Sequence, residues 1–89
     1  MTDVTYFLYI LKSENSDRHY IGTTDDIAKR KQKHNSGSVR STKAYRPWNV
    51  VHIEEFHDKT NARKREIFLK KTARARVELF AQLASSSSG

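Results

Sequence analysis

A short predicted helix carries two side chains that suggest chemistry rather than packing. The stretch from His19 to His34 reads HYIGTTDDIAKRKQKH, and its second half resembles a helix that begins behind two aspartates. At 3.6 residues per turn, the best candidate for its inward stripe is Ile27, Arg30, Lys31 and His34. A guanidinium and an imidazole are costly to bury without partners. Arg30 and His34 are therefore candidates for a functional site.

A second predicted helix carries an acid in a similarly unexpected place. One of its faces consists of Ala62, Glu66, Leu69 and Ala73. Glu66 is the single acid among residues 59–76, a stretch that contains eight lysines and arginines. A carboxylate on a core-facing stripe is costly unless it is paired, hydrogen-bonded or bound to a metal. Two interpretations follow: a buried salt bridge to Arg30 or another cation, or a metal ligand.

Two tyrosines complete the set of candidates. Tyr9 lies in the first predicted strand, and Tyr20 lies in the second, two residues before Gly22. If these strands pair through the turn at residues 13–17, both phenols can lie at one end of the hairpin. A lone tyrosine in a strand is usually a core residue with a hydrogen-bonded hydroxyl. Two tyrosines together with an arginine, a histidine and an acid form a more specific pattern.

The elements that must position these residues can be predicted from composition and periodicity. We expect strands at Val4–Leu11, His19–Gly22 and Asn49–Phe56, and helices from Thr24 or Asp25 to His34, over 61–71 behind a Thr60 cap, and more weakly over Arg74–Ala84. The first strand is apolar on both faces and should be central. The predicted fold is a single small α/β (α+β) domain, with a three-stranded antiparallel sheet flanked by helices in the order β-β-α-β-α and a possible third helix. The domain should span residues 1–83, followed by a disordered Ser-rich tail at 84–89.

The arrangement of charge indicates the kind of partner. The chain of 89 residues has a net charge of +7, and residues 27–53 contain seven basic side chains and no acid. A surface of this kind suits a polyanion, so nucleic acid is the expected partner. No strongly apolar helix face accompanies the charge, so no membrane association is expected. The absence of cysteine, of a signal peptide and of a long apolar run favours a soluble cytoplasmic protein.

The ordered motifs resemble the GIY-YIG nuclease superfamily, in particular its short stand-alone bacterial members. FLY at Phe7–Tyr9 corresponds to the first tripeptide, and YIG at Tyr20–Gly22 matches the second, with Gly22 as a structural motif residue. Arg30 follows the glycine by eight residues and His34 comes four residues later, as in the family. ARKREIFLKK resembles the metal-binding helix, with Glu66 as its acid. The similarity covers residues 5–72.

The resemblance implies a metal-dependent endonuclease that hydrolyses DNA phosphodiester bonds with one Mg²⁺ or Mn²⁺ ion. Glu66 would hold the metal, Arg30 would hold the phosphate, and Tyr9 or Tyr20 would take a proton from the attacking water, with Tyr9 the preferred base. His34 would donate a hydrogen bond or relay a proton. The basic residues expected to bind nucleic acid are Lys29, Lys33, Arg40, Lys43, Arg46 and Arg63. Recognition of branches, flaps or damaged sites, as in repair or recombination, is expected over recognition of base sequence.

Three departures from the family pattern keep other functions open. The first tripeptide is FLY rather than Gly-Ile-Tyr, although its tyrosine, Tyr9, remains. Thr23 stands where some members have a lysine, and no asparagine follows Lys71, although many catalytic domains have one near their C-terminal end. A non-catalytic nucleic-acid-binding module that keeps this fold is the main alternative, and a small interaction protein is a third. A protein partner could supply target choice, and the oligomeric state is not predicted.

Overall fold

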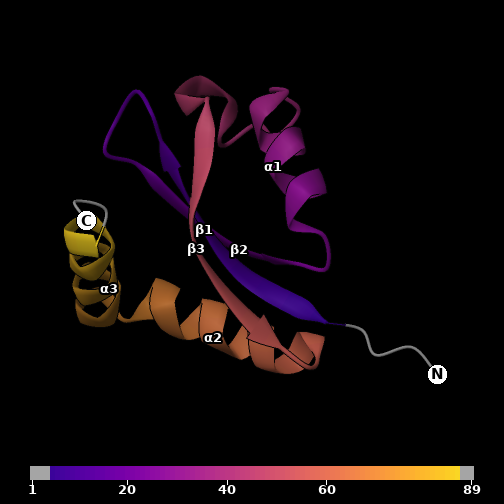
Figure 1. The fold of residues 1–89 in the computed structure, drawn as a ribbon, viewed down its shortest axis with the longest axis vertical. Helices are drawn as coiled ribbons and strands as arrows, with labels where there is room; N and C mark the ends of the chain where they lie inside the picture. Colours follow the sequence, from indigo (N-terminus) through magenta and orange to yellow (C-terminus); the bar gives the residue numbers. More distant parts are fainter. Residues whose placement is uncertain (1–4, 87–89) are drawn as a thin grey trace.

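The computed structural model describes residues 5–86, and the chain forms a three-stranded antiparallel sheet of order β2-β1-β3 (Figure 1). The strands are β1 (Tyr6–Ser13), β2 (His19–Thr24) and β3 (Trp48–Phe56). Three helices follow the predicted order: α1 (Ile27–Asn35), α2 (Lys59–Lys71) and α3 (Ala73–Ser86), with a single 3-10 turn, η1 (Lys43–Tyr45), before β3. The predicted fold class and element order are confirmed.

Strand β1 supplies both hydrophobic cores because its alternate side chains point to opposite faces of the sheet. On one face, Leu8 and Ile10 pack with Leu69 of α2 and with side chains of α3. On the other face, Tyr9 packs with Trp48 and with side chains of α1 and the loop that follows it. The prediction that this strand is central and covered on both sides is therefore correct. Helix α1 covers one face, and α2 and α3 cover the other (Figure 1).

Helix α1 begins later than the sequence indicated. Strand β2 continues to Thr24, which pairs with Phe7 of β1, and the Thr24 hydroxyl accepts a hydrogen bond of 3.1 Å from the Asp26 N–H. Asp26 then becomes the N-cap, and its carboxylate accepts a hydrogen bond of 3.1 Å from the Lys29 N–H. Thr24 is therefore the last residue of β2 and does not act as the N-cap of α1.

Helix α2 begins earlier than predicted, because Asp58 is its cap in place of Thr60. The Asp58 carboxylate accepts a hydrogen bond of 2.8 Å from the Asn61 N–H. Ionised carboxylates are strong caps because they also face the positive end of the helix dipole. Thr60 lies within the first turn of the helix.

The chain beyond Lys71 differs from the prediction at one point. Thr72 has an extended backbone (φ −108°, ψ 90°) that separates α2 from α3. Ala73 consequently begins α3 and is exposed, so it does not belong to the inward stripe of α2. Of the predicted tail at 84–89, residues 84–86 form the end of α3, and residues 87–89 lie outside the described residues, as does Val4 of the predicted first strand.

Candidate active site

Strands β1 and β2 place the two tyrosines on one face of the sheet. Tyr9 lies opposite Gly22, and Leu11 lies opposite Tyr20. A Cβ atom at position 22 would lie 2.7 Å from the Tyr9 hydroxyl oxygen and 2.9 Å from a ring carbon of Tyr20. No real side chain tolerates contacts that short, so the glycine allows the two phenol rings to approach each other. Their ring centroids are 6.1 Å apart.

Helix α1 brings His34 onto the same two rings. Its predicted inward stripe is correct: Ile27, Arg30 and Lys31 are half-buried and His34 is fully buried. The Nε2 atom of His34 lies 3.2 Å from the Tyr9 hydroxyl, and its ring centroid lies 4.6 Å from that of Tyr20. The other ring nitrogen, Nδ1, lies 2.9 Å from the Thr42 hydroxyl.

Arg30 lies one turn before His34 and points its positive charge at the same phenols. Its guanidinium approaches the Tyr9 and Tyr20 hydroxyls closely enough to interact with both. Its buried Nε atom, however, has no hydrogen-bond partner. The cation is therefore held near the tyrosines with part of its donor capacity unused.

The protonation of this cluster follows from burial. Burial raises the pKa of the Tyr9 phenol above its ordinary value, and the neighbouring Arg30 guanidinium opposes this only in part. Burial also lowers the pKa of the His34 imidazole, and the charge of Arg30 lowers it further. At neutral pH the site therefore holds a protonated phenol beside a neutral imidazole, an arrangement suited to moving a proton.

Glu66 of α2 is buried, and only one of its carboxylate oxygens is paired. Oε2 accepts a hydrogen bond of 2.7 Å from the Lys70 ammonium, whereas Oε1 has no partner. The negative charge of Glu66 contributes to the raised pKa of Tyr9, after the larger effect of burial, so the carboxylate is electrostatically coupled to the Tyr9 phenol. The predicted salt bridge is thus present, with Lys70 rather than Arg30 as its cation.

The carboxylate of Glu66 fits a hard divalent cation. An unpaired, buried oxygen is available, and carboxylate oxygens are the ligands that Mg²⁺ and Mn²⁺ prefer. Within residues 5–86 no three acids or histidines gather into a metal site. Water and phosphate oxygens would therefore have to supply the remaining ligands, as is usual for Mg²⁺.

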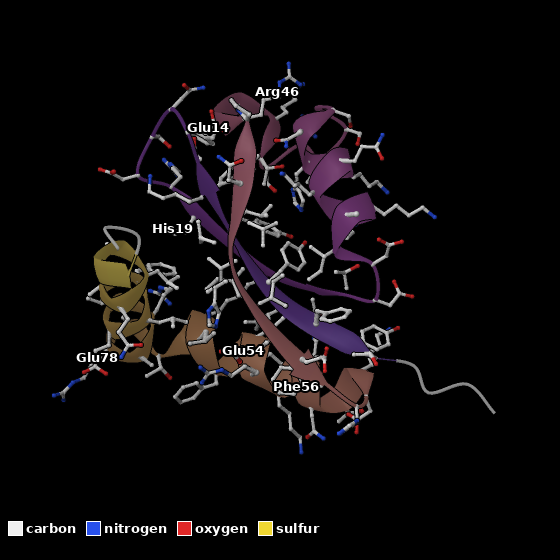
Figure 2. The ribbon with its side chains drawn as sticks, in the orientation of Figure 1. Glu14, His19, Arg46, Glu54, Phe56 and Glu78 are labelled. Atoms are coloured by element: carbon white, nitrogen blue, oxygen red, sulfur yellow. The ribbon has the colours of Figure 1, made fainter. Side chains whose placement is uncertain are left out.

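A cavity of about 580 Å³ gives access to this region beside the β2 edge of the sheet. Tyr20 and Lys70 line it on the side of the candidate site, and His19 and Phe80, whose rings stack 3.9 Å apart, line it toward α3. Figure 2 shows His19 directed toward α3. Tyr20 is therefore reached from the open edge strand, whereas Tyr9 lies buried behind it and is only 1% exposed.

The six basic residues predicted to bind nucleic acid are all exposed, but they do not form one group. Four of them lie on the outer side of α1 and in the loop after it: Lys29, Lys33, Arg40 and Lys43. Arg46 lies at the end of the molecule beside this loop (Figure 2), and its guanidinium packs over Gly37, whose φ is +86°. Arg63 stands apart on α2, which covers the other face of the sheet.

Two residues of the site were not found from the sequence. Lys70 follows Glu66 by four residues, so helical spacing could have identified it as the partner of the acid. Thr42 lies in an irregular basic loop and is nevertheless only 2% exposed. No periodicity in that loop predicts its burial or its contact with His34.

Comparison with known proteins identifies a family and several relatives that this chain resembles. Residues 5–78 match the family model of the GIY-YIG catalytic domain. The chain is 39% identical over 70 residues to a UPF0213 protein of Listeria welshimeri, covering 78% of this chain and 77% of that one. It is 34% identical over 76 residues to the UPF0213 protein YazA of Bacillus subtilis, covering 84% and 76% of the two chains.

A solved structure of another UPF0213 protein also resembles this chain. The solution NMR structure of a UPF0213 protein from Bacillus halodurans matches with a TM-score of 0.54 at 29% identity, covering 89% of this chain and 84% of that chain. In the part of the chain that the structure describes, no helix has the length and apolar character needed to span a bilayer.

Proposed function

The chain belongs to the family of the GIY-YIG catalytic domain and is related to the UPF0213 proteins, a short stand-alone bacterial group, and from this premise we propose that it is a divalent-metal-dependent DNA endonuclease. The family is one of nucleases, so membership itself implies cleavage of nucleic acid. The metal dependence, the DNA substrate and the roles of individual residues are the proposal.

The proposed base is Tyr9, which takes a proton from the attacking water. Its own hydroxyl proton passes to His34, whose Nε2 atom is 3.2 Å away. The resulting hydroxide attacks phosphorus, and the bond from phosphorus to the 3′ oxygen breaks, with that oxygen taking a proton from solvent. A protonated His34 beside Arg30 is electrostatically unfavourable, so once the reaction is complete the imidazole passes its extra proton back to the Tyr9 oxygen, and the phenol releases its own proton to solvent.

Arg30 and Glu66 would stabilise the charge that develops during this step. A guanidinium offers two parallel donors to phosphate oxygens. The buried Nε atom of Arg30 has no partner within the protein and is available to a phosphate oxygen. Glu66 would hold the divalent ion through its unpaired Oε1. When bound, such an ion supplies Lewis-acid stabilisation of the phosphate and the leaving oxygen.

One observation carries the proposal. Among the described residues, the buried side-chain nitrogen and oxygen atoms without a hydrogen-bond partner are Arg30 Nε and Glu66 Oε1. Leaving buried polar groups unpaired costs about 1–3 kcal/mol each, and more for charged groups. Both atoms belong to charged groups that act on Tyr9. A phosphate at the first and a cation at the second would satisfy both.

We propose further that target choice depends on DNA shape, as in repair or recombination, and that cleavage occurs in the cytoplasm. The exposed lysines and arginines of α1 and its following loop suit phosphate contacts, which position a protein on DNA without reading base sequence. A protein partner could add target choice. Cleavage of matched linear and branched duplexes of one sequence tests this, and equal rates on both would contradict it.

The nuclease activity is tested with supercoiled plasmid in Mg²⁺, in Mn²⁺ and in EDTA. Wild type should nick the plasmid only with metal, and Glu66→Gln should abolish nicking without loss of folding. Glu78→Gln on α3 is the matched control, because Glu78 is an exposed acid that also pairs with a cation four residues away in the helix, Arg74. If wild type binds DNA with steep salt dependence and cuts under no metal, the binding-module alternative is correct.

A further inference from the structure

Thr42 is a buried hydroxyl in contact with the imidazole of the candidate site. It lies in the loop between α1 and β3, is 2% exposed, and its Oγ1 is 2.9 Å from His34 Nδ1. A neutral imidazole has one N–H and one acceptor nitrogen, and the hydrogen bond made by one nitrogen decides the state of the other. The direction of the Thr42 hydrogen bond therefore decides whether His34 can accept a proton from Tyr9.

The Thr42 hydroxyl proton already has an acceptor. Oγ1 donates to the Val39 carbonyl at 3.4 Å, which leaves the lone pairs of Oγ1 to accept from the His34 Nδ1–H. His34 Nε2 then carries a lone pair and faces the Tyr9 hydroxyl at 3.2 Å.

The surroundings of Tyr9 favour the same direction. The Arg30 guanidinium acts on the phenol oxygen, and a hydroxyl beside a cation turns its lone pairs to the cation and its proton away. The proton of Tyr9 then points at His34 Nε2. The charged and titratable groups around His34 are Tyr9 of β1, Tyr20 of β2 and Arg30 of α1 itself.

The backbone of Thr42 is held in place independently of the site. Its carbonyl accepts a hydrogen bond of 2.9 Å from the indole of Trp48, which is 2% exposed. Its N–H donates to the Val39 carbonyl at 3.1 Å. The hydroxyl is consequently fixed in position before any substrate arrives, as a supporting residue must be.

We propose that Thr42 is a positioning residue that fixes His34 in the tautomer with its proton on Nδ1, so that Nε2 is free to accept the hydroxyl proton of Tyr9. The effect on cleavage rests on the proposed nuclease function. The tautomer itself does not, because it exists in the free protein. In this account Thr42 touches no reacting atom and acts only through His34.

The test combines NMR of ¹⁵N-histidine-labelled protein with cleavage assays. The ring nitrogen signals of His34 are identified as those missing from the spectrum of His34→Gln. In the free wild-type protein at neutral pH, these signals should show the proton on Nδ1. Thr42→Val removes the hydroxyl at nearly constant shape, and it should lose this single tautomer and lower kcat at least tenfold with KM changed less than threefold. Thr42→Ser should restore both, and Thr60→Val, an exposed site on α2, should change neither.

Each outcome decides the proposal. A wild-type His34 with its proton on Nε2 overturns it, as does a Thr42→Val protein with an unchanged tautomer and unchanged kcat. If Thr42→Val does not fold, the wild-type tautomer and its retention in Thr42→Ser decide instead. A wild type that has the Nδ1–H tautomer but cuts no DNA removes the nuclease function and leaves the positioning of His34 intact.

Discussion

Tyr9 and Gly22 are direct partners across β1 and β2, and the Tyr9 hydroxyl occupies the space that a side chain at position 22 would need. The same space is limited by the ring of Tyr20, so one missing Cβ brings two phenols together. The glycine therefore acts through packing, since its backbone does not have a positive φ. This contact connects the YIG tripeptide with the geometry of the site.

Gly22→Ala should consequently impair catalysis more than stability. The added methyl pushes the Tyr9 hydroxyl away from His34, and displacements of about 1 Å in an active site can cost about 100-fold in rate. Overpacking should lower the free energy of unfolding by about 1–3 kcal/mol. Single-turnover cleavage and thermal melting measure the two effects. Thr23→Ala, one residue along β2, is the control, and equal losses in both variants would contradict this role.

Lys70 should compete with the divalent cation for Glu66. Its ammonium pairs with Oε2 at 2.7 Å, and a bound ion would have to tolerate or displace it. Lys70→Met should therefore tighten Mn²⁺ binding about three- to tenfold, measured by calorimetry or Mn²⁺ EPR without DNA. Lys64→Met, at an exposed position of the same helix, should have a smaller effect. Weaker Mn²⁺ binding by Lys70→Met would mean that the ammonium orients the carboxylate for the metal.

Lys29 and Lys33 should contact phosphates rather than take part in the chemistry. They are exposed one turn apart on α1 and, with Gln32 and Ser36, line a hollow on that helix. Each lost phosphate contact should lower the slope of log K against log salt by about 0.9. The double variant Lys29→Gln/Lys33→Gln should thus lose about 2 units of slope, with kcat at saturating DNA unchanged. An unchanged slope would place the DNA on another surface.

Glu54 should stabilise the fold in a pH-dependent way. Burial alone would raise the pKa of this carboxyl, but hydrogen bonds from Arg65 at 2.9 and 3.1 Å and from His52 at 2.8 Å outweigh it and lower the pKa. A lowered folded-state pKa gives stability that is present above the unfolded value of about 4.3 and is lost as pH falls through the folded value.

Glu54→Gln should accordingly lower the free energy of unfolding by about 1 kcal/mol at pH 7, a value limited by the partial exposure of the ion pair. The difference from wild type should shrink as pH falls below the unfolded pKa of about 4.3 and disappear only below the lowered folded-state pKa. Urea denaturation at several pH values measures this, with Glu55→Gln, an exposed neighbour on β3, as the control. A difference that is constant with pH would show that the charge is not responsible.

The sequence predicted the parts of this site that depend on local periodicity. The stripe of α1 identified Arg30 and His34, and the stripe of α2 identified Glu66, because helical spacing alone determines which residues share a face. The burial of β1 followed from its apolar residues on both faces.

The remaining features depend on contacts between distant segments. The pairing of Tyr9 with Gly22 is a matter of strand register, which composition leaves open until the turn geometry is known. Asp26 rather than Thr24 caps α1, because Thr24 pairs with Phe7 of β1 as the last residue of β2. Thr42 reaches His34 because the irregular loop is held by the hydrogen bond from the Trp48 indole to the Thr42 carbonyl.

The most direct test of the proposed chemistry is the single-turnover cleavage rate of Tyr9→Phe, which removes one oxygen and keeps the ring in the core. With Tyr9 as the base, the rate should fall about 10²–10⁴-fold while DNA affinity stays within twofold of wild type. Tyr6→Phe, on the same strand, should cleave at the wild-type rate. A Tyr9→Phe protein that cleaves within threefold of wild type would contradict the account, and Tyr9 would then be a buried core residue beside the site.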